Sequence, residues 1–276
     1  DKLKTFNVST AASFIVSAED IAVAKQSFFA VTGVSGSGDL FKVFGIDIVK
    51  TSNAATIKEN LERIGFIPYA ADFFVPPKRL SCVLNFIRKR DEIGLKYLTP
   101  YHLAANVATS IKLKYRIYGV FDNRYSNMLA KLFQKLGYKR VLITYGLGGL
   151  DEISNIGNTE IVELNKNKIK KYIVSPKDFG IKKATYEDIK AVSREQHVID
   201  FLRILFNKEK GPKRDIVLMN AAATFYVMGK VKTFKEGVEL AKKVLEENKA
   251  ADKLNKLVKL IGDPNKLNEW KIKAKL

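Results

Sequence analysis

Apolar and polar positions follow two patterns along the chain, one typical of buried strands and the other of amphipathic helices. Short apolar runs at 21–25, 115–121 and 141–145 predict strands buried in a sheet. Between the last two runs, residues 125–136 carry apolar side chains at helical spacing, and Gly137 ends the pattern. This strand–helix–strand order predicts two parallel strands joined by a right-handed crossover.

Helical patterns dominate much of the remaining chain. Residues 54–110 are predicted to be mostly helical, with breaks at prolines. Thr233 and Glu236 have the spacing of a capping box, and the apolar side chains after them fall on one face of a helix. A basic stretch at 166–171 leads into a short run, 171–174, that predicts one more strand. Strands and helices in this arrangement predict an α/β fold.

Short polar side chains stand directly before two predicted helices. Ser9 or Thr10 can cap a helix that opens with the apolar run 11–16, which leaves first-turn N–H groups available to an anion. A second turn, 32–39, follows the first predicted strand and is rich in glycine and serine, which bring backbone amides and hydroxyl donors near a phosphate. Taken alone, either turn is more often a capping loop than a ligand site.

An acidic pair follows one of the predicted strands. The run 141–145 leads into a glycine-rich loop, and Asp151 and Glu152 come next, just beyond the C-terminal end of the strand. Binding sites of open α/β sheets lie at that edge. Adjacent acidic residues are usually solvated, but hard carboxylate oxygens also suit Mg²⁺, which takes one or two of them together with water and phosphate.

Length and composition fit one large α/β body. The chain has 276 residues, and 46% of them are hydrophobic, which is enough to bury a sizeable core. Cys82 is the only cysteine, so an intramolecular disulfide and a cysteine-based zinc cluster are excluded, and a reducing compartment is indicated. Neither an apolar run of about 18 residues nor a basic-then-apolar leader occurs, so we expect a cytoplasmic protein.

The net charge indicates an anionic ligand or partner. Lys and Arg number 48 against 29 Asp and Glu, which gives a formal charge of +19. Such a surface attracts small phosphorylated substrates, and it attracts nucleic acids as well. Lysine-rich surfaces also occur in proteins of hot environments, and that explanation needs no ligand.

Four short motifs resemble those of one known family. Residues 1–10 are similar to D-G-x-x-T-x-N-[IV]-S-T, 149–154 read G-L-D-E-I-S, 157–159 read G-N-T, and 220–222 resemble part of an L-N-A-A helix. All four are similar to motifs of anthranilate phosphoribosyltransferase, in the family it shares with the nucleoside phosphorylases. The resemblance extends to about Asp263. The two polar turns also stand in the order found in this family, which favours phosphate binding at both.

The resemblance implies a mixed-sheet α/β domain with a helical subdomain, as in nucleoside phosphorylases and phosphoribosyltransferases. Residues 1–53 and 111–276 would form the α/β domain with its C-terminal helices, and 54–110 would belong to the helical subdomain. Asp1 falls where the family's G-T-G-G-D loop ends, so we expect helices to precede this sequence in the full-length protein. Family dimers form largely through that region, and a homodimer is expected only if it is present.

The implied activity is Mg²⁺-dependent transfer of a phosphoribosyl group from phosphoribosyl pyrophosphate to an aromatic amine, nominally anthranilate, in tryptophan biosynthesis. The donor carries its own leaving group, so no catalytic nucleophile is expected from the protein. Asp151 and Glu152 are expected to bind magnesium, with Ser9 contributing to a second ion. The residues expected to contact the donor are Asp1, Thr5, Asn7, Ser9, Thr10, Lys25, Gly33 and Ser37.

The acceptor side departs from the family pattern. Family enzymes carry K-H-G-N-R after the first strand, whereas residues 25–29 read K-Q-S-F-F, so that Phe28 replaces a polar anchor. Residues 103–108 take the place of the family's L-G-P-L-x-N-P segment. Arg88 or Arg90 is the expected partner of the acceptor carboxylate, and a solvated basic helix face explains both arginines equally well.

Three functions remain open at this stage. The acidic pair favours the transferase, because a nucleic-acid groove has little use for carboxylates beside its phosphate site. The altered K-H-G-N-R motif favours the alternative, a non-catalytic basic paralogue that binds nucleic acid, and a nucleoside phosphorylase is a weaker third hypothesis. His102 and His197, the only histidines, stand in no metal-binding or triad spacing.

Overall fold

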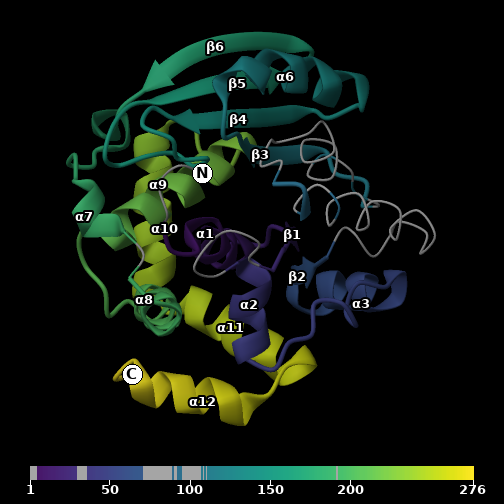
Figure 1. Cartoon of the computed structure of the whole chain (residues 1–276), viewed down its shortest axis with the longest axis vertical. Coiled ribbons are helices and arrows are strands. Elements are labelled where there is room, and N and C mark those ends of the chain that lie inside the picture. Colours follow the sequence, from purple (N-terminus) through teal and green to yellow (C-terminus); the bar gives the residue numbers. More distant parts are fainter. Residues whose placement is uncertain are drawn as a thin grey trace.

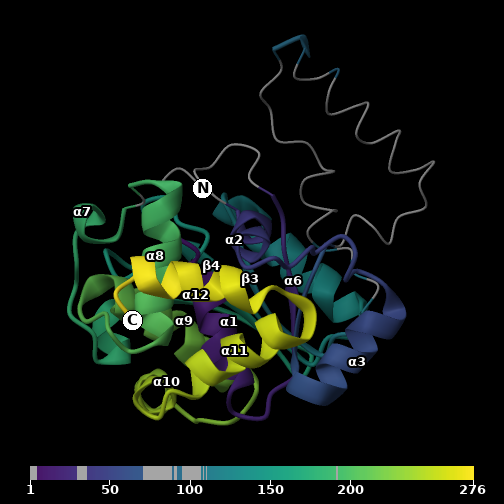
Figure 2. The same cartoon turned by 90° about the horizontal axis from the view of Figure 1, so that it is seen from below.

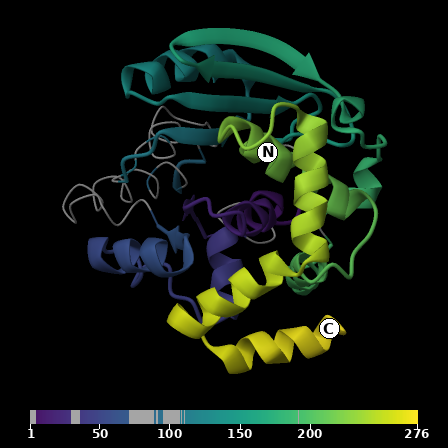
Figure 3. The same cartoon turned by 180° about the vertical axis from the view of Figure 1, so that it is seen from behind.

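The larger sheet lies at one end of the molecule, and most of the described helices lie to one side of it (Figure 1). The computed structural model describes residues 5–29, 36–70, 89, 92–94, 107, 109, 111–190 and 192–276. Seen from behind, helix α1 (Val8–Ser17) lies between that sheet and the C-terminal helix α12 (Pro264–Lys273) (Figure 3). None of the helices within the described residues is long and apolar enough to cross a membrane.

The larger sheet is mixed, as expected. Its strands run in the order β3 (Tyr115–Gly119), β4 (Arg140–Gly146), β5 (Thr159–Asn165) and β6 (Lys168–Val174). Strands β3 and β4 are parallel, whereas β5 is antiparallel to both β4 and β6. The parallel pair is joined through the short 3₁₀-helix η2 (Asn123–Tyr125) and α6 (Ser126–Lys135). The predicted strand–helix–strand unit and its parallel pairing are therefore confirmed.

A smaller sheet joins two segments that are far apart in sequence. Strand β1 (Val23–Gln26) pairs in parallel with β2 (Phe66–Tyr69), which follows α3 (Ala54–Ile64). Gly65 ends α3 with a φ of +69°, and the four residues after it are all buried. The expected helix is confirmed at 54–64, whereas 66–69, where a break was expected at Pro68, form a strand because the run is buried on both faces and too short for a helix. Most of 71–110 lies outside the described residues, and the domain division stays a prediction.

Helices of the C-terminal half enclose α1. The helices in contact with it are α8 (Arg194–Leu205), α9 (Pro212–Val227), α10 (Phe234–Glu246) and α11 (Lys249–Ile261). The short helices η3 (Pro176–Phe179) and α7 (Tyr186–Ile189) pack against α10 and α9, respectively. Thr233 caps α10 by accepting a hydrogen bond from the N–H of Glu236, which confirms half of the predicted capping box, while the Glu236 carboxylate accepts from the N–H of Lys232. Viewed from below, α12 lies across α8 and α11 (Figure 2).

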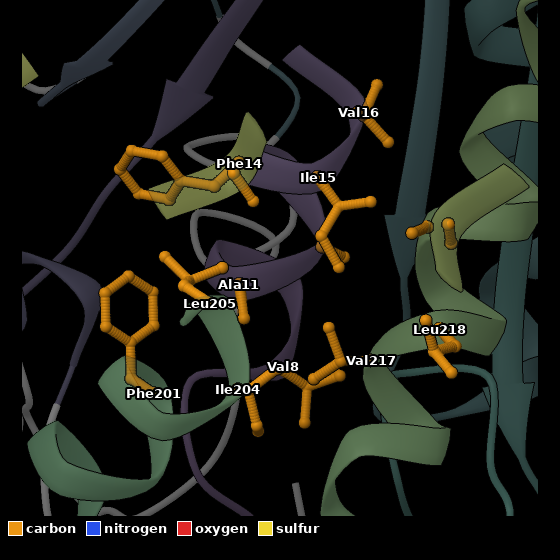
Figure 4. Close-up of a cluster of buried hydrophobic side chains, with 14 of the residues drawn as sticks. Val8, Ala11, Phe14, Ile15, Val16, Phe201, Ile204, Leu205, Val217 and Leu218 are labelled. Atoms are coloured by element: carbon orange, nitrogen blue, oxygen red, sulfur yellow. The ribbon is translucent and has the colours of Figure 1, made fainter. Parts of the chain in front are cut away.

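The main core forms around α1, which is buried over most of its length. Phe14 and Ile15 are fully buried, and Figure 4 shows them between side chains of α8 and α9. The ring of Phe14 also stacks on Phe66 of β2, with centroids 4.3 Å apart. A second core lies between α6 and the larger sheet, and α9 contacts β3 and β4. Helix α1 is thus held rigidly from several sides.

Candidate active site

A cleft of about 460 Å³ opens between α1, β1, β3 and the loop after β4. Its volume falls within the range of small-molecule sites, about 300–1,000 Å³. The polar side chains that line it include Ser9, Lys25, Ser37, Arg116, Asp151 and Glu152. Five of these six were predicted to bind donor or metal, and the fold brings them together from four separate segments of the chain.

A tight glycine turn sets the position of the acidic pair. The N–H of Gly146, the last residue of β4, donates to the carbonyl of Leu150 at 2.8 Å. Gly148 and Gly149 between them have φ values of +127° and +103°, which side chains larger than hydrogen rarely permit. Asp151 therefore lies just beyond the C-terminal end of β4, as the sequence predicts.

Gly119 allows the acidic loop to approach the neighbouring strand. A Cβ atom built on Gly119 would lie 1.6 Å from the carbonyl oxygen of Asp151, far inside any permitted contact. Thr144 of β4 adds a long hydrogen bond from its hydroxyl to the same oxygen, at 3.5 Å. The acidic loop therefore packs directly against the C-terminal end of β3.

Glu152 lies at the N-terminus of α1. Its Oε2 accepts a hydrogen bond from the Thr5 hydroxyl at 3.3 Å, and the backbone of Ser9 lies close enough to the carboxylate to lower its pKa slightly. Burial, together with the charge of Asp151, raises the pKa of Glu152 to about 8, although Thr5 and Lys25 act against that shift. The first turn of α1, expected to face a phosphate, thus lies beside a protein carboxylate.

Lys25 brings a positive charge to the other side of the acidic pair. Its Nζ donates to the carbonyl of Gln26 at 3.1 Å. Burial lowers the pKa of Lys25 to about 8, while Glu152 and Asp151 oppose this effect. Removal from water raises the free energy of the ammonium group, so an anionic ligand in the cleft would stabilise its charged form.

The start of α1 differs in detail from the prediction. Asn7 is the N-cap residue and makes no side-chain capping bond, so the expectation that Ser9 or Thr10 caps the helix is wrong. Ser9 lies in the first turn and lines the cleft, whereas Thr10 points into the core with 1% of its surface exposed. Within the described residues, Asn7 Nδ2 and Thr10 Oγ1 are buried without a hydrogen-bond partner. Donor contacts of Asn7 and Thr10 stay predictions.

The second polar turn is described only from Gly36 onward. Ser37 is the first residue of α2 (Ser37–Val43), and its hydroxyl accepts a hydrogen bond from the N–H of Phe28 at 3.3 Å. Phe28 lines the cleft beside it, so the substituted position of the K-H-G-N-R motif does face the site. Predicted site residues outside the described part of the chain are Asp1, Gly33, Arg88 and Arg90, together with His102.

Two residues without a predicted role also line this cleft. Arg116 of β3 donates from Nη2 to Gln26 Oε1 at 2.9 Å, and its guanidinium lies 5.2 Å from the ring centroid of Tyr118. A lone charge inside the apolar run 115–121 was the signal that could have identified it. Asn220 of α9 had been recognised as part of a motif, but only the fold shows that it lies beside the acidic loop. His197 is buried in α8 and does not line this cleft.

Comparisons with known proteins identify the family of this chain. The glycosyl transferase family, a/b domain, matches residues 1–251. Anthranilate phosphoribosyltransferase of Petrotoga mobilis is 33% identical over 258 residues, covering 94% of this chain and 72% of that protein. The Methanococcoides burtonii enzyme is 33% identical over 269 residues, covering 98% and 73%.

Solved structures show the same fold. The anthranilate phosphoribosyltransferase of Thermus thermophilus superposes with a TM-score of 0.82 at 29% identity, over 94% of this chain and 74% of that one. The Saccharomyces cerevisiae enzyme in complex with PRPP and Mg superposes with a TM-score of 0.82 over 94% and 70%, and at 23% identity it shows the fold alone. The chain belongs to the anthranilate phosphoribosyltransferase family of glycosyl transferases, and it is a phosphoribosyltransferase.

Proposed function

We propose that this enzyme transfers the phosphoribosyl group of phosphoribosyl pyrophosphate to anthranilate, the reaction that serves tryptophan biosynthesis, with Mg²⁺ bound at Asp151 and Glu152. The observation that carries the proposal is the position of this acidic pair between Lys25 and the first turn of α1, inside one cleft. The complex of the yeast relative with PRPP and Mg supports the choice of donor and metal.

The donor set fits a hard divalent cation. The two adjacent carboxylates are partly withdrawn from water, and burial and the Asp151 charge raise the pKa of Glu152 to about 8. A cation between them would offset both effects. Within the described residues, no three His, Cys, Asp or Glu side chains lie together as a complete metal site. Water and diphosphate oxygens would therefore supply the remaining ligands, and Ser9 is the proposed contact to a second ion.

The reaction needs charge neutralisation and alignment from the protein. A bond forms between the acceptor nitrogen and C1′ while the bond from C1′ to the pyrophosphate oxygen breaks, and the nitrogen then loses a proton. When bound, Mg²⁺ would neutralise charge that develops on the departing pyrophosphate. Lys25 and Ser37 are the proposed protein contacts to the same phosphates, because their side chains line the cleft beside the acidic pair.

The acceptor end of the cleft differs from the family pattern and supports only slow use of anthranilate. Phe28 occupies the position of a polar anchor, and Gln26 follows Lys25 where the family has histidine. A missing hydrogen bond to the acceptor would cost about 1–3 kcal/mol of binding free energy. The complex of the yeast relative with 4-fluoroanthranilate supports anthranilate as the acceptor to test first.

The test is calorimetric titration of phosphoribosyl pyrophosphate with and without Mg²⁺. Wild-type protein should bind the donor more tightly with the metal, and the double variant Asp151→Asn, Glu152→Gln should lose that gain. Glu246→Gln, Glu247→Gln is the matched control, since it removes an adjacent acidic pair at the exposed C-terminal end of α10. Equal donor affinity of the wild type with and without Mg²⁺ would overturn the metal assignment, and absence of donor binding would overturn the proposed function.

A further inference from the structure

Asn220 connects helix α9 to the backbone directly after the acidic pair. Its Oδ1 accepts a hydrogen bond from the N–H of Ile153 at 3.1 Å, and its Nδ2 donates to the carbonyl of the same residue at 2.9 Å. The amide thus pairs with both polar groups of one residue, in the way that a neighbouring strand would. Ile153 is the residue that follows Glu152.

The orientation of the Asn220 amide is fixed by a third hydrogen bond. Nδ2 also donates to the carbonyl of Ile216, one turn earlier in α9, at 2.8 Å. Both amide protons are therefore used, and a flipped amide would set its oxygen against two carbonyls. Asn220 is 6% exposed and Ile153 is fully buried, so water cannot replace these bonds at low cost.

Helix α9 is a rigid support for such a contact. Residues 216–223 of the helix are buried in the main core, and α9 packs against α1, which carries Ser9 to the other side of Glu152. The Asn220 amide therefore ties the acidic loop to α9, and α9 in turn packs against α1, which lies beside Glu152.

We propose that Asn220 is a positioning residue for the metal site: it holds the backbone at Ile153 so that Asp151 and Glu152 present their carboxylates to Mg²⁺. This inference rests on the function proposed above. Groups that orient metal ligands typically change metal affinity by about 10–100-fold when they are removed. The role of Asn220 is to place the carboxylates, without contact to the substrate or to the metal.

Two variants of Asn220 remove the contact in different ways. Asn220→Leu keeps the volume but leaves the N–H and carbonyl of Ile153 unpaired, and Asn220→Asp sets a carboxylate oxygen against the carbonyls of Ile153 and Ile216. Met219→Ala is the matched control, because it opens a cavity at the preceding, fully buried position of α9 and leaves the amide in place. Circular dichroism establishes the folded fraction of each protein, and only folded protein is compared.

The experiment measures, by calorimetry, the Mg²⁺ concentration that gives half of the metal-dependent gain in phosphoribosyl pyrophosphate binding. Both Asn220 variants should raise this concentration about 10–100-fold, with metal-free donor affinity changed less than about threefold. Met219→Ala should leave the midpoint unchanged even where it lowers the melting temperature. If the folded Asn220 variants keep the wild-type midpoint, or if Met219→Ala shifts it equally, the positioning role is wrong. A wild-type protein that binds the donor without any gain from Mg²⁺ would instead overturn the metal assignment on which the positioning role rests, and one that binds no donor would overturn the proposed function.

Discussion

At the scale of single residues, the most constrained position of the site is a glycine. Gly119→Ala would place a Cβ atom 1.6 Å from the carbonyl oxygen of Asp151, and no rotation of a side chain can relieve a contact between backbone and Cβ. We expect the substitution to displace the acidic loop and to cost at least about 3 kcal/mol, the upper range of overpacking penalties. Urea denaturation measures the loss, and metal-dependent donor binding should disappear in the variant that still folds.

The prediction for Gly119 has a matched control at the end of α6. Gly137→Ala also replaces a glycine at a chain reversal, with φ of +80° but no atom within 4 Å of the added Cβ. Strain alone should therefore destabilise Gly137→Ala by a smaller amount, about 1 kcal/mol, and leave metal binding intact. Equal stability losses in the two variants would show that the clash at Asp151 is absent in solution.

His197 gives a second prediction at this scale, concerning pH. Burial lowers the pKa of His197 below its usual 6.5, and Lys213 adds to the shift while Asp200 opposes it. The unfolded chain therefore binds the proton at higher pH than the folded protein, so stability is lost as pH falls below about 6.5. Neither ring nitrogen has a partner among the described residues, so His197→Phe should fold.

Urea unfolding at several pH values checks the role of His197. Below pH 6.5 the free energy of unfolding of the wild type should fall more steeply than that of His197→Phe, by up to about 1.4 kcal/mol per pH unit. Parallel curves for the two proteins would show that His197 can take up its proton without unfolding.

The site residues that the sequence predicted share one property: each belongs to a motif of several consecutive positions. Ser9, Lys25, Asp151 and Glu152 lie together at one cleft, and their roles in binding donor and metal stay predictions. Arg116 was missed because it stands alone in an apolar run. The surroundings of Ser9 could not be predicted either, because its backbone lies near Glu152, which is distant in sequence and is brought close only by tertiary packing.

At the scale of helices and strands, the contact between α9 and α10 offers a test in which two effects have opposite signs. Gly→Ala inside a helix normally stabilises by about 1 kcal/mol through helix propensity. At Gly237 the added Cβ would lie 2.8 Å from the backbone of Ala222 in α9, which forces the two helices apart. We expect overpacking to prevail, so that Gly237→Ala is destabilised by about 1–2 kcal/mol net.

Urea denaturation of Gly237→Ala measures this balance. Glu239→Ala, on the exposed side of the same helix, should stay within about 0.5 kcal/mol of the wild type. A gain in stability for Gly237→Ala would mean that α9 and α10 lie farther apart than the structure shows.

Elements were predicted from sequence wherever the apolar pattern was long or was bounded by a glycine. The crossover helix ending at Gly137 and the strand Arg140–Gly146 are of this kind, and they were found within one or two residues of the prediction. Strand β2 was missed because four apolar residues have no period that separates strand from helix. These four residues form a strand because they pair with β1, and that pairing cannot be predicted from the local sequence.

At the scale of the whole molecule, the net charge of +19 is the feature that the transferase assignment leaves unexplained. Contacts between Lys or Arg and a polyanion release counterions, so binding of this kind weakens about 10³–10⁵-fold between 50 and 200 mM salt for six to ten phosphate contacts. A small diphosphate held by Mg²⁺, Lys25 and the start of α1 should depend far less on salt, because its contacts are few and partly withdrawn from water.

We therefore expect weak, steeply salt-dependent binding of oligonucleotides, and binding of phosphoribosyl pyrophosphate that persists at physiological ionic strength. Paired titrations of a single-stranded oligonucleotide and of the donor, each at several salt concentrations, measure both slopes. The double variant Asp151→Asn, Glu152→Gln separates the two sites further: it should weaken donor binding with Mg²⁺ and leave oligonucleotide binding unchanged or slightly stronger, since two negative charges are lost. Tight oligonucleotide binding at physiological salt without detectable donor binding would favour the nucleic-acid alternative over catalysis.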